Sequence, residues 1–399
     1  MKLLNQSVQW HITEVCPNRC KHCYIDGNTN YERRKNELNM DGLITILQNL
    51  DEFERKFDVS IGTYVLTGGD PFEHADFEKL LSEIYLRGKI IKILGIPERI
   101  SKETLMLLDR YNVDTYQVSL DGMKNTHDMI RGKGSFDRTI DAIRLMNELS
   151  NVHPHIMYTL HKQNCNEMFE LIHYLGNSNL SVSFSFDFLV LEGQARKNFS
   201  MVNKEEVDEI LIQYRKERLR LKEENSKLIL REKVKLFETF DIEGANDKFK
   251  KYSYISGCMC GIASVAILPN GDLLPCRRLP ITIGNLLEDS YSELFLNNVL
   301  MRKLRRISSY KMCGDCDYGK VCRGCPAVAY SVTGDPFDEM IYCNRKKKVE
   351  ASLCEPPIDC TEKEEFAFVT NNLISSIQRE GALANMSALK HDIYKRRLL

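Results

Sequence analysis

Three cysteines near the N-terminus have a spacing that suits a metal centre. Cys16, Cys20 and Cys23 form a C-x3-C-x2-C pattern directly after the first predicted strand. Three thiolates this close together can hold one face of a [4Fe–4S] cluster, which takes four ligands, so one iron would stay open to another molecule. A zinc site is the alternative. Structural zinc takes four protein ligands, however, and the only nearby candidate for the fourth is His22.

A second group of eight cysteines lies between residues 258 and 343. It contains two C-x2-C pairs separated by five residues, a spacing that by itself is typical of a zinc ribbon. The segment 267–276 is predicted to form a hairpin with Asn270-Gly271 at its turn. The members of the group are Cys258, Cys260, Cys276, Cys313, Cys316, Cys322, Cys325 and Cys343.

The other three of the 14 cysteines stand outside these groups. Cys165 is predicted to be a small core residue, and Cys354 and Cys360 are predicted to be free thiols of the C-terminal tail. The chain has no apolar signal segment, so we expect it in the cytoplasm. In that reducing compartment clustered cysteines bind metal more often than they form disulfides.

The elements that must position these residues alternate between strand and helix through the first half of the chain. Strands are predicted at 7–13, 62–66, 90–96, 116–120, 155–160 and 182–190, and helices at 41–57, 76–87, 102–111, 136–149 and 166–175. This alternation indicates an α/β fold with a parallel sheet, either open and doubly wound or a partial barrel. In both folds the site lies at the carboxyl ends of the strands. The sequence places unusually polar residues at those ends.

The N-terminal cysteine motif and these strand ends together resemble the radical S-adenosylmethionine (SAM) superfamily. Gly68-Gly69-Asp70-Pro71 looks like the GGE-P motif of that family, with Asp in place of the commoner Glu. The resemblance implies a partial (β/α)6 TIM-type barrel in which SAM chelates the open iron. One electron then cleaves SAM to a 5′-deoxyadenosyl radical. The residues that match SAM-contacting positions of the family are Tyr24, Gly68, Gly69, Asp70, Ser119 and Arg131, the last pairing with the SAM carboxylate.

The C-terminal cysteines resemble the SPASM extension of radical SAM enzymes, which holds two auxiliary [4Fe–4S] clusters. The resemblance implies three clusters in all, and a cysteine-rich domain of a short β-hairpin, loops and helices. One auxiliary cluster would take Cys258, Cys260, Cys276 and Cys325, and the other Cys313, Cys316, Cys322 and Cys343. The chain departs from the family at Cys322 and Cys325, which are separated by two residues rather than three.

SPASM enzymes mostly modify peptides or proteins by oxidation, so the resemblance favours a ribosomal peptide or protein side chain as the substrate. The alternative is a small molecule, such as a tetrapyrrole carboxylate side chain. Sulfatase maturation is disfavoured because Arg277 and Arg278 follow Cys276, where sulfatase-maturing relatives have an aspartate. Both arginines are either carboxylate ligands or surface residues.

The candidates for an acid or base that acts on the substrate are Asp187, His161 and Glu192. A non-catalytic metal scaffold is the third hypothesis, and the intact Gly68-Gly69-Asp70, Ser119 and Arg131 set argues against it.

Composition and organisation limit the partners. The 55 Lys and Arg and 56 Asp and Glu residues give a net charge of −1, which disfavours a nucleic-acid partner. No apolar run approaches the roughly 18 residues of a membrane helix. We expect a barrel at 1–200, a charged helical connector at 201–255, a SPASM domain at 256–350 and a helical tail at 351–399.

The remaining partners follow from the resemblance. Because the chain begins a few residues before the first strand, a peptide substrate would have to be recognised by a separate protein, by the charged helical connector or by the tail. The resemblance also implies an electron donor of flavodoxin or ferredoxin type and inactivation by oxygen.

Overall fold

A single curved sheet runs through the computed structural model, which describes residues 5–25, 31–57, 59–233, 257–314, 316, 319 and 322–343. The strand order is β10-β9-β8-β1-β2-β3-β4-β5-β6-β7. Neighbouring strands from β8 through β1 to β7 are parallel, whereas β9 is antiparallel to both β8 and β10. The strands are β1 (Asn5–Thr13), β2 (Ser60–Gly68), β3 (Ile90–Leu94), β4 (Val113–Ser119), β5 (His153–Leu160), β6 (Val182–Phe188), β7 (Leu228–Leu230), β8 (Ser264–Ile267), β9 (Asp272–Leu274) and β10 (Gly284–Asn285).

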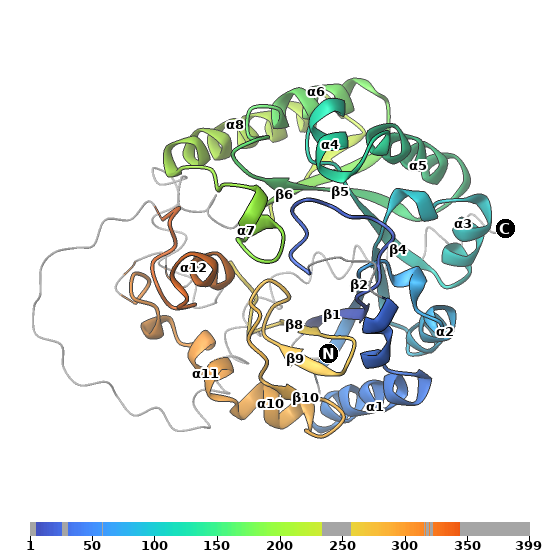
Figure 1. Ribbon diagram of the computed structural model, residues 1–399, viewed down its shortest axis with the longest axis vertical. Coiled ribbons are helices and arrows are strands. Elements are labelled where there is room, and N and C mark those ends of the chain that lie inside the picture. The colour runs from blue at the N-terminus through green and yellow to red at the C-terminus, as the bar shows by residue number, and fades with distance from the viewer. Residues whose placement is uncertain are drawn as a thin grey trace, which may run out of the picture.

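Helices follow the strands and cover the outside of the sheet (Figure 1). They are α1 (Met40–Phe57), α2 (Phe77–Leu86), α3 (Lys102–Arg110), α4 (Lys124–Arg131), α5 (Ser135–Leu149), α6 (Met168–Asn177), α7 (Ala195–Asn198) and α8 (Lys204–Glu223). In α1 the buried side chains Leu43, Ile46, Leu47 and Leu50 recur at the spacing of one helical face. Since the sheet has two edge strands, β7 and β10, the barrel is partial, which confirms the predicted fold class.

The five helices expected in the first half are present within a few residues of their predicted bounds. The short helices α4 and α7 were not predicted. The segment expected to be a helical connector begins with α8, whose Asn203 and Glu206 form a reciprocal capping box. It then adds β7 to the sheet beside β6, a strand that the charged sequence concealed.

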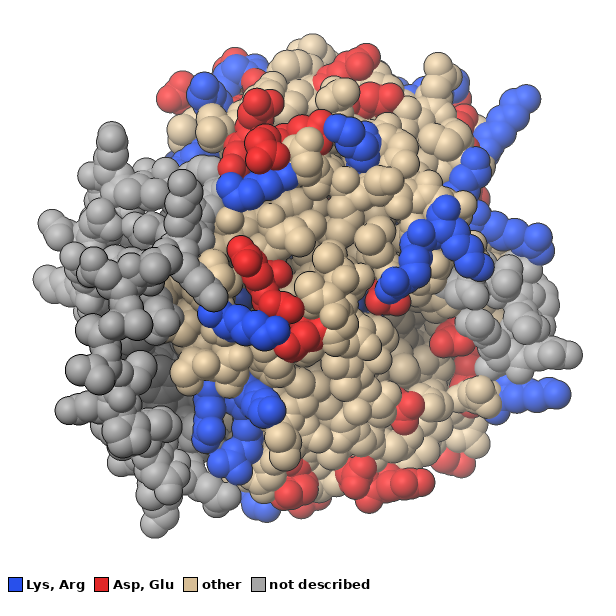
Figure 2. All heavy atoms as spheres, turned by 60° about the vertical axis from the view of Figure 1, so that its left-hand side comes forward, with Lys and Arg blue, Asp and Glu red and all other residues tan. Residues whose placement is uncertain are grey.

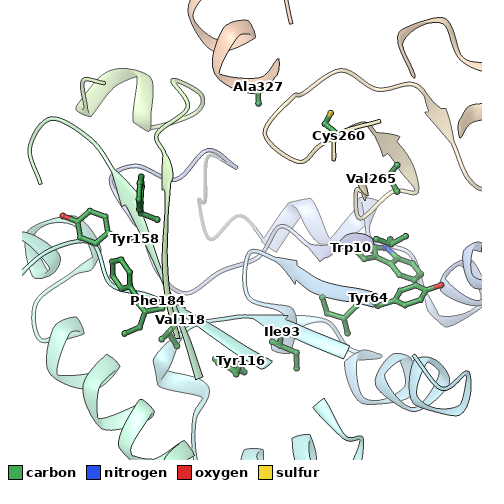
Figure 3. Close-up of a cluster of buried hydrophobic side chains, with 14 of the residues drawn as sticks. Trp10, Tyr64, Ile93, Tyr116, Val118, Tyr158, Phe184, Cys260, Val265 and Ala327 are labelled. Carbon is green, nitrogen blue, oxygen red and sulfur yellow. The ribbon is translucent and has the colours of Figure 1, made fainter. Parts of the chain in front are cut away.

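The cysteine-rich region continues the same sheet. β8 pairs with β1, and β8 and β9 form the predicted hairpin, with Gly271 at φ +90° in its turn. Helices α10 (Tyr291–Asn297), α11 (Val299–Arg305) and α12 (Pro326–Thr333) follow. One hydrophobic core spans both parts of the chain, because Cys260, Val265 and Ala327 belong to the same buried cluster as Trp10 and Tyr64 (Figure 3).

Both acidic and basic side chains occur across the face shown in Figure 2. No helix among the described residues is both long enough and apolar enough to cross a bilayer. The predicted tail at 351–399, with Cys354 and Cys360, lies outside the described residues, whereas Cys165 is buried as predicted.

Candidate active site and cysteine clusters

A pocket opens at the carboxyl ends of the parallel strands, where the alternation of strand and helix placed the site. Segments far apart in the sequence meet there: the loop after β1, the ends of β2, β4 and β6, helix α4, and the segment after β9. The singled-out residues that line the pocket are Cys16, Cys20, Cys23, Tyr24, Gly68, Gly69, Ser119, Arg131, Asp187, Arg277 and Arg278.

The two glycines at the end of β2, Gly68 and Gly69, bring this part of the chain against the cysteine loop. A Cβ atom on Gly69 would lie 2.1 Å from the carbonyl oxygen of Val15, and Gly68 has φ +135°. The N–H of Gly69 donates to the carbonyl of Thr13, and the N–H of Asp70 donates to the carbonyl of Val15, both at 2.8 Å. Only glycine allows this close approach, so the motif holds the start of the Cys16–Cys23 loop in place.

Asp70, the next residue of the motif, is not part of the pocket lining. It is fully buried, accepts a hydrogen bond from the N–H of Phe72 and forms an ion pair with Arg99, which also contacts Glu73. Burial raises the pKa of Asp70, and Arg99 opposes that shift. The resemblance placed Asp70 among the residues that contact SAM. Its carboxylate pairs with Arg99, and Gly68 and Gly69 of the same motif line the pocket.

A buried carboxylate that the sequence analysis did not single out organises the opposite wall. Asp121 is fully buried and accepts hydrogen bonds from Arg131 Nε, from the N–H of Thr159 at 2.8 Å, and from His22, whose Nε2 lies 3.0 Å away. Although burial opposes it, the charge of Arg131 lowers the pKa of Asp121 well below its usual value. Asp121 follows one of the polar strand ends, but its contacts with Arg131, Thr159 and His22 could not be predicted from the sequence.

Asp121 thereby connects the cysteine loop to the arginine. His22 lies between Cys20 and Cys23, and its Nε2 is engaged by Asp121 rather than by the thiols. The zinc alternative needed His22 as its fourth ligand. Arg131 also reaches Cys20, with 3.5 Å between Nη1 and Sγ.

The three N-terminal thiols fit an iron–sulfur cluster in chemistry and surroundings. Burial, together with negative charge on Cys20 or Cys23, raises the pKa of Cys16 to about 12, so these thiols are close neighbours. Bound iron removes that cost because it coordinates the thiolate. Among the described residues no three His, Cys, Asp or Glu side chains converge on a single-ion site. The thiolates of a cubane bind separate irons, so its ligands need no such convergence.

The eight C-terminal thiols form two groups of neighbours. Cys260 hydrogen-bonds to both Cys258 and Cys276, which lowers the pKa of Cys258 to about 7 and that of Cys276 to about 6. Burial raises the pKa of Cys325 to about 12, and a negative charge on Cys258 contributes. We call these four residues the first quartet.

The second quartet is Cys313, Cys316, Cys322 and Cys343. Burial raises the pKa of Cys313 to about 11, with contributions from Cys343 and Cys316. Burial likewise raises the pKa of Cys322 to about 12, with contributions from the other three cysteines. Each quartet therefore has the number and type of ligands that one [4Fe–4S] cluster takes.

Most of the positive charge in the pocket comes from Lys233, Arg277 and Arg278. We call the part of the pocket that these three residues line its cationic end. Asp187 forms ion pairs with Arg278 at 2.9 Å and with Lys233 at 3.0 Å, and despite burial these cations lower its pKa. The guanidinium of Arg277 lies over the ring of Tyr24, 5.4 Å from its centroid, and has no carboxylate within ion-pair distance among the described residues. Lys233, Arg277 and Arg278 outnumber the two carboxylates that line the pocket, Asp187 and Glu14.

The three candidates for an acid or base differ in their placement. Asp187 lines the pocket, but both of its oxygens are occupied by cations. His161 is fully buried against Phe199, with ring centroids 4.5 Å apart, and burial lowers its pKa to about 4. Glu192 pairs with Arg196 on α7. The pocket lining includes neither His161 nor Glu192.

Comparison with known families agrees with this geometry. Residues 10–175 match the family model of the radical SAM superfamily, and residues 258–326 match that of SPASM, an iron–sulfur cluster-binding domain. The chain therefore carries a radical SAM domain followed by a SPASM domain. SAM and iron–sulfur clusters are therefore cofactors of this enzyme. The first match contains Cys16 to Arg131, and the second contains every cysteine of the two quartets except Cys343.

Relatives of this radical SAM enzyme fall into two groups. An AdoMet-dependent heme synthase from Methanosarcina barkeri is 28% identical, over 84% of this chain and 95% of the relative. The subtilosin biosynthesis protein AlbA from Bacillus subtilis is 24% identical, over 79% of this chain and 66% of the relative. Among solved structures, Streptococcus suis SuiB bound to S-adenosylmethionine has a TM-score of 0.65 at 18% identity, over 85% of this chain and 77% of SuiB. That last likeness concerns the fold alone.

Proposed function

We propose that this enzyme cleaves SAM reductively and oxidises a carboxylate-bearing small molecule, such as a tetrapyrrole with acid side chains. The observation that carries the proposal is the cationic end of the pocket. There Arg277 has no carboxylate partner among the described residues, while Asp187 balances Arg278 and Lys233 only in part. A guanidinium in such a place is suited to a substrate carboxylate.

The proposed roles of the cofactor-binding residues follow their positions. Cys16, Cys20 and Cys23 would hold the cluster that binds SAM, and Arg131, oriented by Asp121, would hold the SAM carboxylate. Tyr24, Gly68, Gly69 and Ser119 would line the rest of the SAM site. When bound, SAM and its cluster supply a 5′-deoxyadenosyl radical that removes a hydrogen atom from the substrate.

In this proposal the protein positions the substrate and accepts an electron from it. Arg277 would fix the substrate carboxylate in the pocket, with Tyr24 beneath its guanidinium. After the hydrogen atom leaves, the substrate must lose a second electron, and the two quartets would hold clusters that accept it. Since the ion pairs hold Asp187 ionised and occupied, we assign it the positioning of Arg278 and Lys233 rather than proton transfer.

The relatives support this substrate class and keep a second one open. The heme synthases match over nearly their whole length, which favours the small molecule. Relatives of the other group include AlbA, the sporulation killing factor maturation protein SkfB and the mycofactocin maturase MftC. The same cationic end would accept an acidic peptide, so a peptide is the second candidate. Either reaction needs an external one-electron donor, for which we propose a flavodoxin or ferredoxin.

The first test is the iron and sulfide content per chain after anaerobic reconstitution. Three clusters predict roughly twelve irons. About four irons, or zinc in their place, would contradict the two auxiliary clusters. The second test is formation of 5′-deoxyadenosine with a chemical reductant, followed by mass spectrometry of candidate tetrapyrrole carboxylates and acidic peptides. The Cys16→Ala variant serves as the control without a radical source.

A further inference from the structure

An arginine lies buried between the two cysteine quartets. Arg323 occupies the shortened spacing between Cys322 and Cys325, and its backbone has φ +55°, a left-handed conformation that non-glycine residues rarely adopt. Its side chain is nevertheless packed inside the protein, since only 1% of the residue is exposed. Surrounding contacts must therefore hold this conformation.

Those contacts join the segments that carry the two quartets. The guanidinium donates to the carbonyl of Leu304 at 2.9 Å, to the carbonyl of Cys260 at 3.3 Å, and to the carbonyl of Cys258. Its Nε is buried without a hydrogen-bond partner. Arg323 thus connects α11 and the Cys258–Cys260 segment to the loop that carries Cys322 and Cys325.

The charge of Arg323 has no carboxylate partner among the described residues. This distinguishes it from Arg278, the other arginine at the first quartet, whose charge is paired with Asp187 at 2.9 Å. A buried cation without a counterion is costly, and backbone carbonyls compensate that cost only in part. Within the described part of the chain, the groups left to balance the charge are the cysteines.

Arg323 lies next to members of both quartets. Its guanidinium donates to the carbonyls of Cys258 and Cys260 in the first quartet. In the second quartet it directly follows Cys322 in the chain. A cubane with four thiolate ligands carries net negative charge, which increases when the cluster accepts an electron, and nearby charge and burial set its potential.

We propose that Arg323 is a positioning residue that places a fixed positive charge between two auxiliary clusters and raises their reduction potentials. The inference rests on the proposed function in one respect, namely that the quartets hold iron–sulfur clusters. The charge stabilises the reduced state of each cluster relative to the oxidised one. It therefore makes the clusters better acceptors for the electron that the substrate must lose.

The test compares Arg323→Gln, which removes the charge, with Arg323→Lys, which keeps it. Lys303→Gln removes an exposed charge from α11, beside Leu304, and is the matched control. Iron content is measured first, and midpoint potentials are then measured by a redox titration followed by electron paramagnetic resonance. We expect lower auxiliary potentials in Arg323→Gln, values near wild type in Arg323→Lys and Lys303→Gln, and no shift of the cluster whose signal responds to SAM.

The other possible outcomes distinguish an electrostatic role of Arg323 from a purely structural one. Unchanged auxiliary potentials in a fully loaded Arg323→Gln protein would overturn the proposal. So would loss of about eight irons from both Arg323 variants, because the side chain would then serve only to hold the loop. Loss of iron in Arg323→Gln alone, with normal potentials in Arg323→Lys, would support the need for the charge. A wild-type protein with only about four irons would contradict the proposed function instead, before any variant is compared.

Discussion

Replacement of Asp121 by asparagine tests how the cysteine loop and Arg131 are held together. The substitution keeps the shape of the side chain and removes the charge that Arg131 and His22 share. Removing one partner of a buried ion pair typically costs about 3–5 kcal/mol. Because the Arg131 side chain is 19% exposed at the pocket, water can partly replace the lost partner. We therefore expect the free energy of unfolding to fall by about 3 kcal/mol.

The same change should weaken SAM binding. An unpaired Arg131 is free to turn away from the pocket, and a hydrogen bond to a charged group contributes about 1.5–3 kcal/mol. At about 1.4 kcal/mol per tenfold change, the dissociation constant of SAM should rise roughly 10- to 100-fold. Equilibrium dialysis under anaerobic conditions measures it, with variants compared at equal iron content.

Asp128→Asn is the matched control for this experiment. Asp128 lies on the same helix, α4, and accepts hydrogen bonds from the N–H groups of Gly134 and Phe136, but it makes no contact with Arg131. We expect its SAM affinity to stay within about twofold of wild type, since it loses only a local cap. Equal SAM affinity in Asp121→Asn and wild type would refute the reasoning. A stability loss alone would reduce Asp121 to a packing role.

Three further predictions follow from the same contacts. Arg99→Met leaves the buried carboxylate of Asp70 without its cation, and urea unfolding should show a free energy of unfolding lower by about 2 kcal/mol. Arg110→Met removes an exposed ion pair with Glu78 and should stay close to wild type. Arg277→Met should raise the KM for a carboxylate substrate at least about tenfold while substrate-free SAM cleavage stays unchanged, and equal KM values would remove Arg277 from the substrate site. Burial lowers the pKa of His161 to about 4, so the folded chain keeps this ring neutral while the unfolded chain protonates it below about pH 6.5. The free energy of unfolding should therefore decrease as the pH is lowered from about 6.5 to about 4. In His161→Gln the slope of the free energy of unfolding against pH should be smaller by about 1.4 kcal/mol per pH unit.

Much of the fold could be predicted because its signals are local. The alternation of apolar strands with amphipathic helices depends on residues within one element, and so does the Asn270-Gly271 turn of the β8–β9 hairpin. The N-terminal cysteines lie within eight residues of one another, so their spacing alone indicated a shared centre. β7 was missed because its three residues follow a long charged helix and carry little pattern of their own.

The tertiary structure decided the partners of the charged groups. Asp121 meets His22 across 99 positions of sequence, Asp70 meets Arg99 across 29, and Asp187 meets Arg278 after the chain has left the barrel and returned beside β1. Arg323 is an ordinary surface type by sequence, yet it is buried between two quartets. Spacing determines which residues are neighbours along the chain, whereas strand order and register determine which charges face each other across the sheet. The sequence by itself therefore determined the chemistry of the thiols, and only the folded chain decided which charges tune them.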